Sequence, residues 1–407
     1  MYERLSKIYY KDSSGYQAEY EKRINSYGTV KLPFRIKPFK GSDEFECFYV
    51  NHMELDILHE KIIKQSNEIQ FIADKLPPIA IRQYIQAKLV DELMSTNEIE
   101  GVQSTRAEMT DAMAVREKKA TKTQKKVRHL SLVNSYFKLL ADKNGKITSL
   151  EQIKEIYDSL VKDEIKEEDQ LDGEIFRSGP VDVVTSTQKV IHKGIYPEML
   201  IQSSLKDLIN YLNEYNAPML YKIAIAHYYF GYIHPFYDGN GRTSRYIASM
   251  YLKEELDQLT ALTLSYSTNK LKQYYYDIFN ESNNPLNKGE LTFFCHTFFS
   301  IVYQAQEDIL EDLAERVEKI GQLHQLINEL EELDTLCKDI LFIIGQDYIF
   351  GLEGEGIEKS ILIKGLDVTK YKVDKSLKQL REQELVINTK NNPVKVTLSS
   401  GLSDQLN

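Results

Sequence analysis

The sequence has few of the residues that form disulfides or metal centres. Its three cysteines, Cys47, Cys295 and Cys337, are far apart and have neither metal-binding nor redox spacing. Such sparse cysteine usage favours a reducing compartment, so we expect a cytoplasmic protein. The eight histidines form no HExxH or other zinc pattern.

Targeting and membrane segments are also missing. The first 16 residues are charged and lack the apolar stretch of a signal peptide. No apolar run reaches the length of a membrane span, so we expect no membrane partner. There is no GxxxxGK[ST] string, which excludes a phosphate loop of the Walker type.

An excess of basic residues is absent as well. The 407 residues include 51 Lys or Arg and 61 Asp or Glu, a net charge of −10. This balance argues against broad non-specific nucleic-acid binding by the whole protein. The length predicts two to three domains.

What the sequence does contain is a dense chemical motif, HPFYDGNGRTSR, from His234 to Arg245. Its glycines let backbone N–H groups turn inward and form an anion-binding concavity. Its arginines suit phosphate oxygens, and Asp238 is a natural Mg²⁺ ligand beside a phosphate. His234 is the obvious proton acceptor near neutral pH. Together these residues indicate a nucleotide-dependent transferase.

The flanking sequence predicts two helices around this motif. Residues 221–233 form an apolar run that Pro235 ends, and helical spacing resumes over 242–252. The glycines therefore lie at a helix N-terminus, where anions are favoured. Arg242 and Arg245, three residues apart, share a face of its first turn. The alternative is an Asp-Gly-Asn-Gly turn that merely links two helices.

The motif resembles the HPFx[DE]GNGRxxR signature of the Fic family at every defined position. The further Gly of the family between the two arginines is Ser244 here. The resemblance implies a mainly α fold, a helical Fic core with a small β-hairpin flap. It also implies protein adenylylation, in which AMP moves from ATP to a hydroxyl side chain of a target protein.

Roles for individual residues follow from the resemblance. His234 would be the catalytic base and Asp238 would hold Mg²⁺. The loop would cradle the phosphates, Arg242 would stabilise the leaving pyrophosphate and Arg245 would anchor the γ-phosphate. The residues expected to contact ATP are Glu100, His234, Gly239, Asn240, Gly241, Arg242, Thr243, Ser244, Arg245 and Leu271.

Nucleobase selectivity is less well defined. Residues 264–279 fall where family members usually hold the base, often with a Y-Ixx-N-R pattern. Leu271 and Lys272 occupy the Asn-Arg positions here. Another nucleotide therefore stays open as the donor.

A second motif lies upstream. Residues 95–101, STNEIEG, resemble the [ST]xxxE[GN] inhibitory motif of the family, with Thr96 first and Glu100 as the acid. It closes a predicted amphipathic helix over 79–99. In the family this glutamate pairs with the second motif arginine, here Arg245, which places the chain with the subclass that carries an N-terminal inhibitory helix. Taken in isolation, this short motif is better interpreted as a solvated glutamate at a helix end.

A hairpin is predicted between Asp172 and His192, with β-prone runs at 175–176, 181–184 and 190–192 and a turn at 186–188. The resemblance makes it a flap that aligns the target protein by strand addition. A structural hairpin that caps a helical bundle is the alternative.

A helix with one apolar seam is predicted over 309–330. Such a helix suits a connector packed on the core or the contact of a homodimer.

The sequence of residues 337–400 predicts three helices, the third of them over 370–384, followed by strands at 385–387 and 394–398. This order of elements predicts a winged-helix module. Residues 364–395 carry eight Lys or Arg against four Asp or Glu. This local charge suits DNA binding, and protein contact is an equal alternative.

We therefore expect four parts. These are an N-terminal segment (1–110) with the inhibitory helix at about 80–100, a Fic core (111–305) with the flap at 172–192, a connector helix (306–336) and a winged-helix module (337–400). Two further functions stay open. In one, Glu100 orients water to remove AMP from a modified protein. In the other, the protein is a DNA-binding regulator with the Fic core as a sensor.

Overall fold

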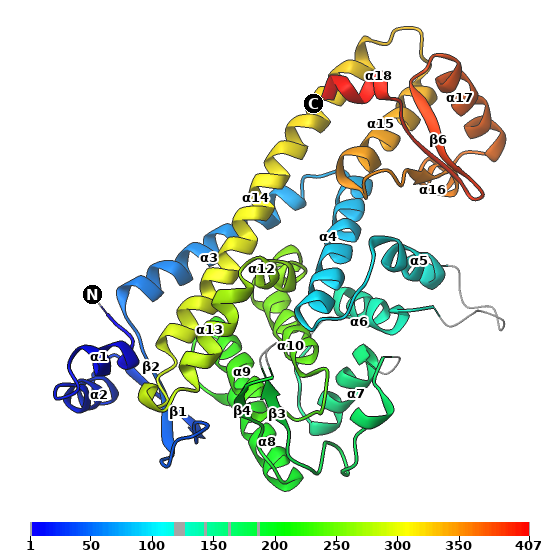
Figure 1. The fold of residues 1–407 in the computed structure, drawn as a ribbon. Helices are drawn as coiled ribbons and strands as arrows, with labels where there is room; N and C mark the ends of the chain where they lie inside the picture. Colours follow the sequence, from blue (N-terminus) through cyan, green and yellow to red (C-terminus); the bar gives the residue numbers. More distant parts are fainter. Residues whose placement is uncertain (1, 118–126, 142–144, 162–163, 185–187, 407) are drawn as a thin grey trace. The chain divides into compact units, whose positions relative to one another are not determined.

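The computed structural model describes residues 2–117, 127–141, 145–161, 164–184 and 188–406. The fold is mainly α-helical, as predicted (Figure 1). The chain forms two compact units, one of Met1–Asn67 with Asp91–Gln306 and one of Glu68–Val90 with Glu307–Asn407. None of the helices in the described residues is long and apolar enough to cross a membrane.

Three helices contribute residues to both units: α3 (Met53–Ala73), α4 (Pro78–Ile99) and α14 (Thr292–Glu329). The other helices of the first unit are α1 (Leu5–Lys11), α2 (Tyr16–Ile24), α5 (Arg106–Glu117), α6 (Leu130–Ala141), α7 (Leu150–Val161), α8 (Glu198–Glu214), α9 (Met219–Ile233), α10 (Asn240–Glu255), α11 (Gln258–Ala261), α12 (Leu264–Lys270) and α13 (Lys272–Ser282). Its 3₁₀ turns are η1 (Glu167–Asp169) and η2 (Pro285–Asn287).

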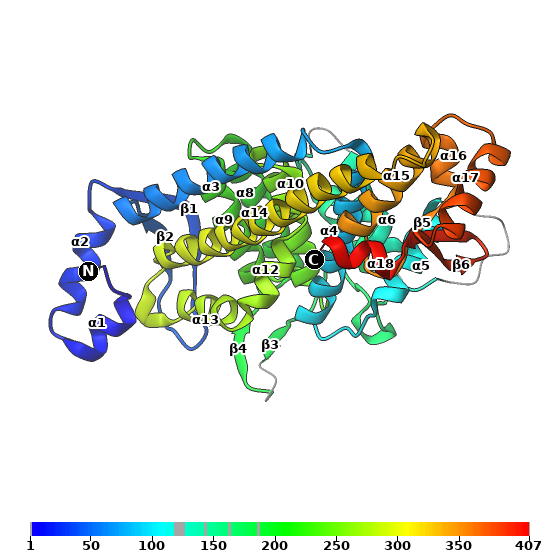
Figure 2. The same cartoon turned by 90° about the horizontal axis from the view of Figure 1, so that it is seen from above.

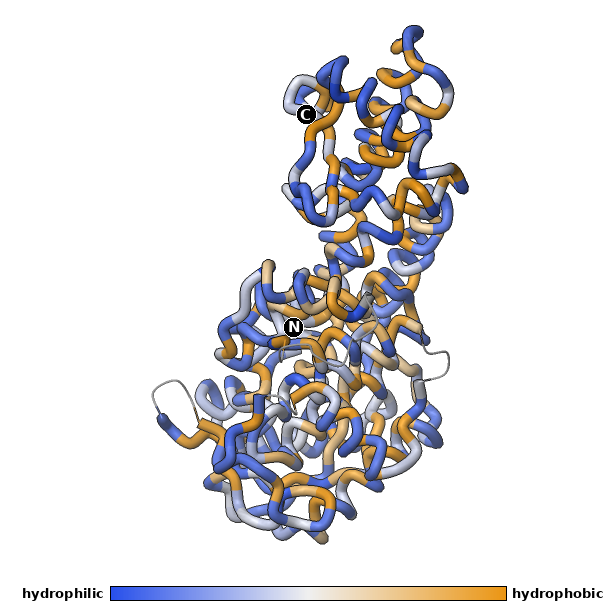
Figure 3. The backbone as a smooth tube through the Cα atoms, turned by 90° about the vertical axis from the view of Figure 1, so that its right-hand side faces the viewer, coloured by the Kyte–Doolittle hydropathy of each residue, from blue (hydrophilic) through white to orange (hydrophobic). Residues whose placement is uncertain are grey.

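Helices α8, α9 and α10 form the centre of the first unit, where α9 packs against both of the others (Figures 1 and 2). Nearly every residue of α9 is buried, which explains why its sequence is an apolar run without a polar face. Along the tube of Figure 3, hydrophobic and hydrophilic segments alternate within the helices. The buried α9–α10 pair gives the loop between them a rigid support.

Four strands of the first unit form two separate hairpins. Strand β1 (Thr29–Ile36) pairs antiparallel with β2 (Phe45–Val50). Strand β3 (Asp182–Val184) pairs antiparallel with β4 (Val190–Lys193), which confirms the predicted hairpin. Turn residues 186 and 187 lie outside the described residues.

The β-prone run at 175–176 forms no strand, so that part of the prediction was wrong. The Glu198 carboxylate at the start of α8 accepts hydrogen bonds from the backbone N–H groups of Glu174, Ile175 and Phe176, at 2.7–2.8 Å. A strand partner would need some of the same donors. The segment is therefore held as a turn around a carboxylate.

In the second unit, α15 (Thr335–Phe350), β5 (Ile357–Glu358), α16 (Lys359–Gly365) and α17 (Lys370–Glu382) precede β6 (Val386–Asn391) and β7 (Val394–Leu398). The short α18 (Ser400–Ser403) and η3 (Asp404–Leu406) follow. The three strands form one sheet in the order β5-β7-β6. Helix α17 ends two residues earlier than predicted, because Glu384 adopts a left-handed φ of 57°.

Candidate active site

The motif forms a clamped loop between α9 and α10. The Asn240 side chain closes it from within, since its Oδ1 accepts a hydrogen bond from Phe236 N (2.9 Å) and its Nδ2 donates to Phe236 O (2.7 Å). Gly239 adopts φ 78°, a conformation that favours glycine, and caps α10. The Thr243 hydroxyl donates to Gly239 O at 2.9 Å. The loop is thus shaped by its own residues, with its N–H groups at a helix N-terminus.

His234 lies at the C-terminal end of α9 in the left-handed region, with φ 53°. Its Nδ1 is 3.4 Å from Gly231 O, so a proton on Nδ1 points back to the helix and leaves Nε2 free to accept another. Burial, with smaller effects of His192 and Arg177, lowers the pKa of His234 to about 3. The imidazole is therefore neutral near pH 7 and can act as a proton acceptor.

Arg177, which the sequence reasoning missed, fixes the backbone at His234. Its guanidinium is fully buried and donates to four carbonyls, His234 O (2.9 Å), Ile195 O (2.8 Å), Gly179 O (2.5 Å) and Ile233 O (3.4 Å). Burial lowers the pKa of Arg177 to about 10. Because its partners are carbonyls, no acidic residue in the sequence signals this role.

Asp238 is the exposed acid of the loop. Its Oδ1 accepts from Gly239 N at 2.6 Å, and its Oδ2 lies 3.7 Å from Arg242 Nη2. Among the described residues, no group of three or more His, Cys, Asp or Glu could hold a metal ion. One exposed carboxylate fits Mg²⁺ only when phosphate oxygens and water complete the coordination, which is the usual arrangement for this ion.

The first motif arginine is already paired. Arg242 is buried and its Nη1 forms an ion pair with Glu164 Oε2, while His129 Nδ1 lies 2.5 Å from the other oxygen of that carboxylate. Burial alone would raise the pKa of Glu164, but His129 and Arg242 lower it overall. Sequence reasoning missed Glu164, which lies 78 residues before its partner.

The second motif arginine pairs with the upstream acid. Arg245 Nη2 lies 2.9 Å from Glu100 Oε1 and 3.0 Å from Thr96 O, and its Nε lies 3.2 Å from Thr96 Oγ1. The Glu100 carboxylate also lies against Gly241, where an added Cβ would come within 2.1 Å of Oε1. The structure therefore brings Glu100 to the N-terminus of α10.

The end of α4 that carries Glu100 is held by the α12–α13 segment. Lys272 Nζ donates to Glu98 O (3.1 Å), and Asn269 Nδ2 donates to Glu98 Oε2 (2.9 Å). The Tyr276 hydroxyl donates to Ile99 O at 3.0 Å. The three donors hold the residues that precede Glu100.

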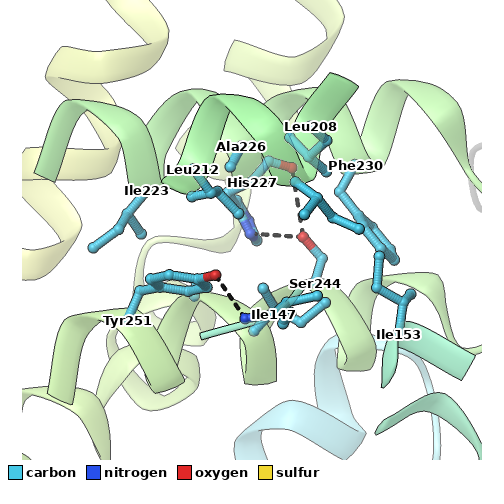
Figure 4. A pocket seen from close by; sticks show the side chains of 13 residues that line it. Ile147, Ile153, Leu208, Leu212, Ile223, Ala226, His227, Phe230, Ser244 and Tyr251 are labelled. Carbon is cyan, nitrogen blue, oxygen red and sulfur yellow. Dashed lines mark hydrogen bonds between the residues drawn. The ribbon is translucent and has the colours of Figure 1, made fainter. Parts of the chain in front are cut away.

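Ser244 is engaged in the interior, and the expected contact of Leu271 with ATP stays a prediction. Ser244 points into the interior, where its hydroxyl lies 2.8 Å from His227 Nδ1 (Figure 4). On the other side of the ring, His227 Nε2 lies 2.8 Å from the Tyr275 hydroxyl. His227 is therefore a packed core histidine. The surrounding cavity, about 20 Å³, has room for about one water molecule and none for a nucleotide. Leu271 lies at the junction of α12 and α13.

The chain is similar to known proteins of one family. The Fic/DOC family model matches residues 147–252. A solved Fic family protein from Desulfovibrio desulfuricans is 17% identical, with a TM-score of 0.54 over 86% of this chain and 98% of that one. A Fic domain-containing signaling protein from Bacteroides thetaiotaomicron is 16% identical, with a TM-score of 0.44 over 64% of this chain and 96% of that one.

A further structure, Fic-1 from C. elegans, is 16% identical, with a TM-score of 0.40 over 63% of this chain and 73% of that one. The matched residues include both motif arginines and the β3–β4 hairpin, whereas Glu100 lies outside them. The similarity to the D. desulfuricans protein extends over most of both chains and concerns the fold. This chain therefore contains a Fic/DOC family domain, at residues 147–252.

Proposed function

We propose that this protein transfers AMP from ATP to a Ser, Thr or Tyr hydroxyl of a target protein, and that Glu100 restrains the reaction. The observation that carries the proposal is the position of the Glu100 carboxylate, against Gly241 and on Arg245. A helix N-terminus with a buried arginine is a site for an anion, and a carboxylate occupies it here. A nucleotide phosphate is also an anion, so the same N–H groups and the same arginine can bind it.

In the proposed reaction, His234 Nε2 takes the proton of the target hydroxyl as its oxygen attacks the α-phosphorus of ATP. The new phosphoester bond forms and the bond to the β-phosphate breaks, which releases pyrophosphate. Mg²⁺ bound by Asp238 would neutralise phosphate charge. Most of the rate enhancement would come from positioning and charge stabilisation.

The arginines of the motif would bind the leaving group. Arg242 would stabilise the charge that develops on pyrophosphate, and Arg245 would hold the γ-phosphate bidentately. Both are engaged by carboxylates in the structure, Arg245 by Glu100 and Arg242 by Glu164. Productive ATP binding therefore requires Arg245 to exchange one anion for another.

The β3–β4 hairpin would align the target. It is a two-stranded sheet, so within the described part of the chain each strand has an edge without a strand partner. An extended segment of the target can add to such an edge through main-chain hydrogen bonds. This mode would place a hydroxyl near His234, because Arg177 joins the carbonyl of Ile195, two residues after β4, to the His234 carbonyl.

Removal of AMP from a modified protein is the second candidate. The same position of Glu100 favours it, because a carboxylate over the phosphate loop can orient a water molecule toward the α-phosphorus. Glu100→Gly separates the two activities. Transfer should rise when this carboxylate is removed, whereas removal of AMP should be lost.

The test uses the full chain with Glu100→Gly, Mg²⁺ and ATP, GTP, CTP or UTP, each labelled at the α-phosphate. We expect covalent label on the protein from ATP, and none after His234→Ala is added, because a general base contributes roughly 10²–10⁴-fold to rate. Nucleotide binding, measured by calorimetry, should persist in the His234→Ala variant. A folded Glu100→Gly protein that binds ATP but takes label from none of the four nucleotides would refute the proposal.

A further inference from the structure

Helix α17 of the second unit has one buried face and one exposed face. Its apolar side chains Val373, Leu377 and Leu380 are buried, and the helix packs against α15. The helix begins after Thr369, whose hydroxyl accepts a hydrogen bond from Lys372 N at 3.4 Å. The exposed face is therefore fixed in direction by the core of the unit.

That exposed face is strongly basic. Helix α17 carries five basic residues and two acidic ones, and both acids lie near lysines. Asp374 lies 2.8 Å from Lys359, and Glu382 lies 3.7 Å from Lys378. Three lysines of the helix are exposed and have no carboxylate partner among the described residues: Lys370, Lys372 and Lys375.

The β6–β7 hairpin extends this surface. Strand β6 packs against α17, and Arg381 Nη1 donates to Asn388 Oδ1 at 2.9 Å. Near the turn of the hairpin, Lys390 is exposed and is likewise unpaired within the described part of the chain. We call Lys370, Lys372, Lys375 and Lys390 the basic face.

The local charge differs in sign from that of the whole chain. Residues 364–395 contain eight Lys or Arg and four Asp or Glu, whereas the chain has 51 and 61. A solvated helix surface normally mixes both signs, often in pairs along the helix. The excess of unpaired lysines here marks a surface for a polyanion.

The shape of the surface favours duplex DNA. The element order α15-β5-α16-α17-β6-β7, with the sheet order β5-β7-β6, places one exposed helix beside one exposed hairpin. Thirteen residues of helix span roughly 20 Å, and the major groove, about 12 Å wide, admits a helix. The hairpin lysine can then reach a phosphate next to the groove.

We propose that residues 337–400 form a winged-helix module that binds duplex DNA, with α17 in the major groove and Lys390 on the adjacent backbone. Exposed Tyr371, in the first turn of α17, would lie among the N-terminal residues of a recognition helix, which contact base edges. The proposal does not depend on the transfer chemistry of the first unit. It gives the protein a second ligand class and a means of localisation to nucleic acid.

The test measures fluorescence anisotropy of a labelled random-sequence 30-base-pair duplex with the full chain. Four phosphate contacts predict a slope of about −3.6 for log K against log salt, or about 150-fold weaker binding at 200 mM than at 50 mM salt. Changing the basic face to glutamine (K370Q, K372Q, K375Q, K390Q) should weaken binding at 50 mM salt at least about tenfold. The matched control changes exposed lysines of the first unit, K7Q, K22Q, K138Q and K206Q, and should bind as the unchanged chain does.

Two results would overturn the proposal. One is no binding at 50 mM salt with about 10 µM protein, where a phosphate-contacting surface must bind. The other is equal competition by polyglutamate and duplex DNA at matched charge concentration, which would assign the basic face to acidic proteins. Circular dichroism of both variants, with nucleotide transfer measured on the same samples, keeps a folding defect or a failure of the transfer chemistry separate from a failure to bind DNA.

Discussion

Glu100→Gly is the most informative single change, because the structure predicts opposite effects on activity and stability. The substitution removes the carboxylate from Arg245 Nη2 and from the space over Gly241. Arg245 keeps its hydrogen bonds to Thr96 and stays buried. A γ-phosphate can then take the place of the carboxylate.

The size of the gain follows from the contact that is lost. A hydrogen bond to a charged group is worth roughly 1.5–3 kcal/mol, and Arg245 is nearly inaccessible to solvent, so screening is weak. If ATP must displace Glu100 before it reacts, removal of the carboxylate should raise the transfer rate roughly 10- to 150-fold. Without ATP, the variant should unfold at a lower temperature, because a buried guanidinium has lost its counter-charge. ATP should restore part of that loss.

The assay is auto-modification with α-labelled ATP, run beside thermal unfolding with and without the nucleotide. Glu98→Gln is the matched control, since Glu98 lies two residues before Glu100 but accepts from Asn269 rather than from an arginine. Adding Arg245→Ala to Glu100→Gly should cancel the gain. A Glu100→Gly protein no faster than the unchanged chain, or a double variant that stays fast, would refute the inhibitory pairing.

Three further predictions concern the loop, the core beneath it and the backbone of His234. Asn240→Ala should lower the free energy of unfolding by about 1–3 kcal/mol, measured in urea, because both hydrogen bonds to Phe236 are lost. Burial lowers the pKa of His227 to about 3 in the folded chain. Between that pH and about 6.5, the usual pKa of histidine, the unfolded chain therefore binds a proton that the folded chain does not. Stability should therefore fall as pH drops below about 6.5, by up to about 1.4 kcal/mol per pH unit for this residue, and His227→Gln should remove that share of the slope in urea titrations at successive pH values. Arg177→Lys should lower kcat more than it changes KM for ATP in initial-rate assays, since it loosens the backbone of His234 without touching the phosphate loop; unchanged kcat would show that this anchor is dispensable.

Local sequence determined much of the architecture. Helix α4 was predicted over 79–99 and spans Pro78–Ile99, and α17 was predicted over 370–384 and spans Lys370–Glu382. The loop between α9 and α10 follows from Pro235 and Gly239, whose backbone preferences act within a few residues. Periodicity and such breakers are short-range signals, so they specify elements and the order of the motif residues along the chain.

The neighbours of the motif were decided by the tertiary structure. Arg177 reaches the His234 carbonyl across 57 residues, and Glu164 reaches Arg242 across 78. The partnership of Glu100 with Arg245, 145 residues apart, was predicted only because both segments resemble a family in which they pair. Likewise, Glu198 replaced the predicted strand at 175–176 with a turn. A carboxylate or guanidinium binds whichever charge or backbone group the packing brings within about 3 Å, and that distance depends on the helices that carry the two groups, not on the residues beside either one.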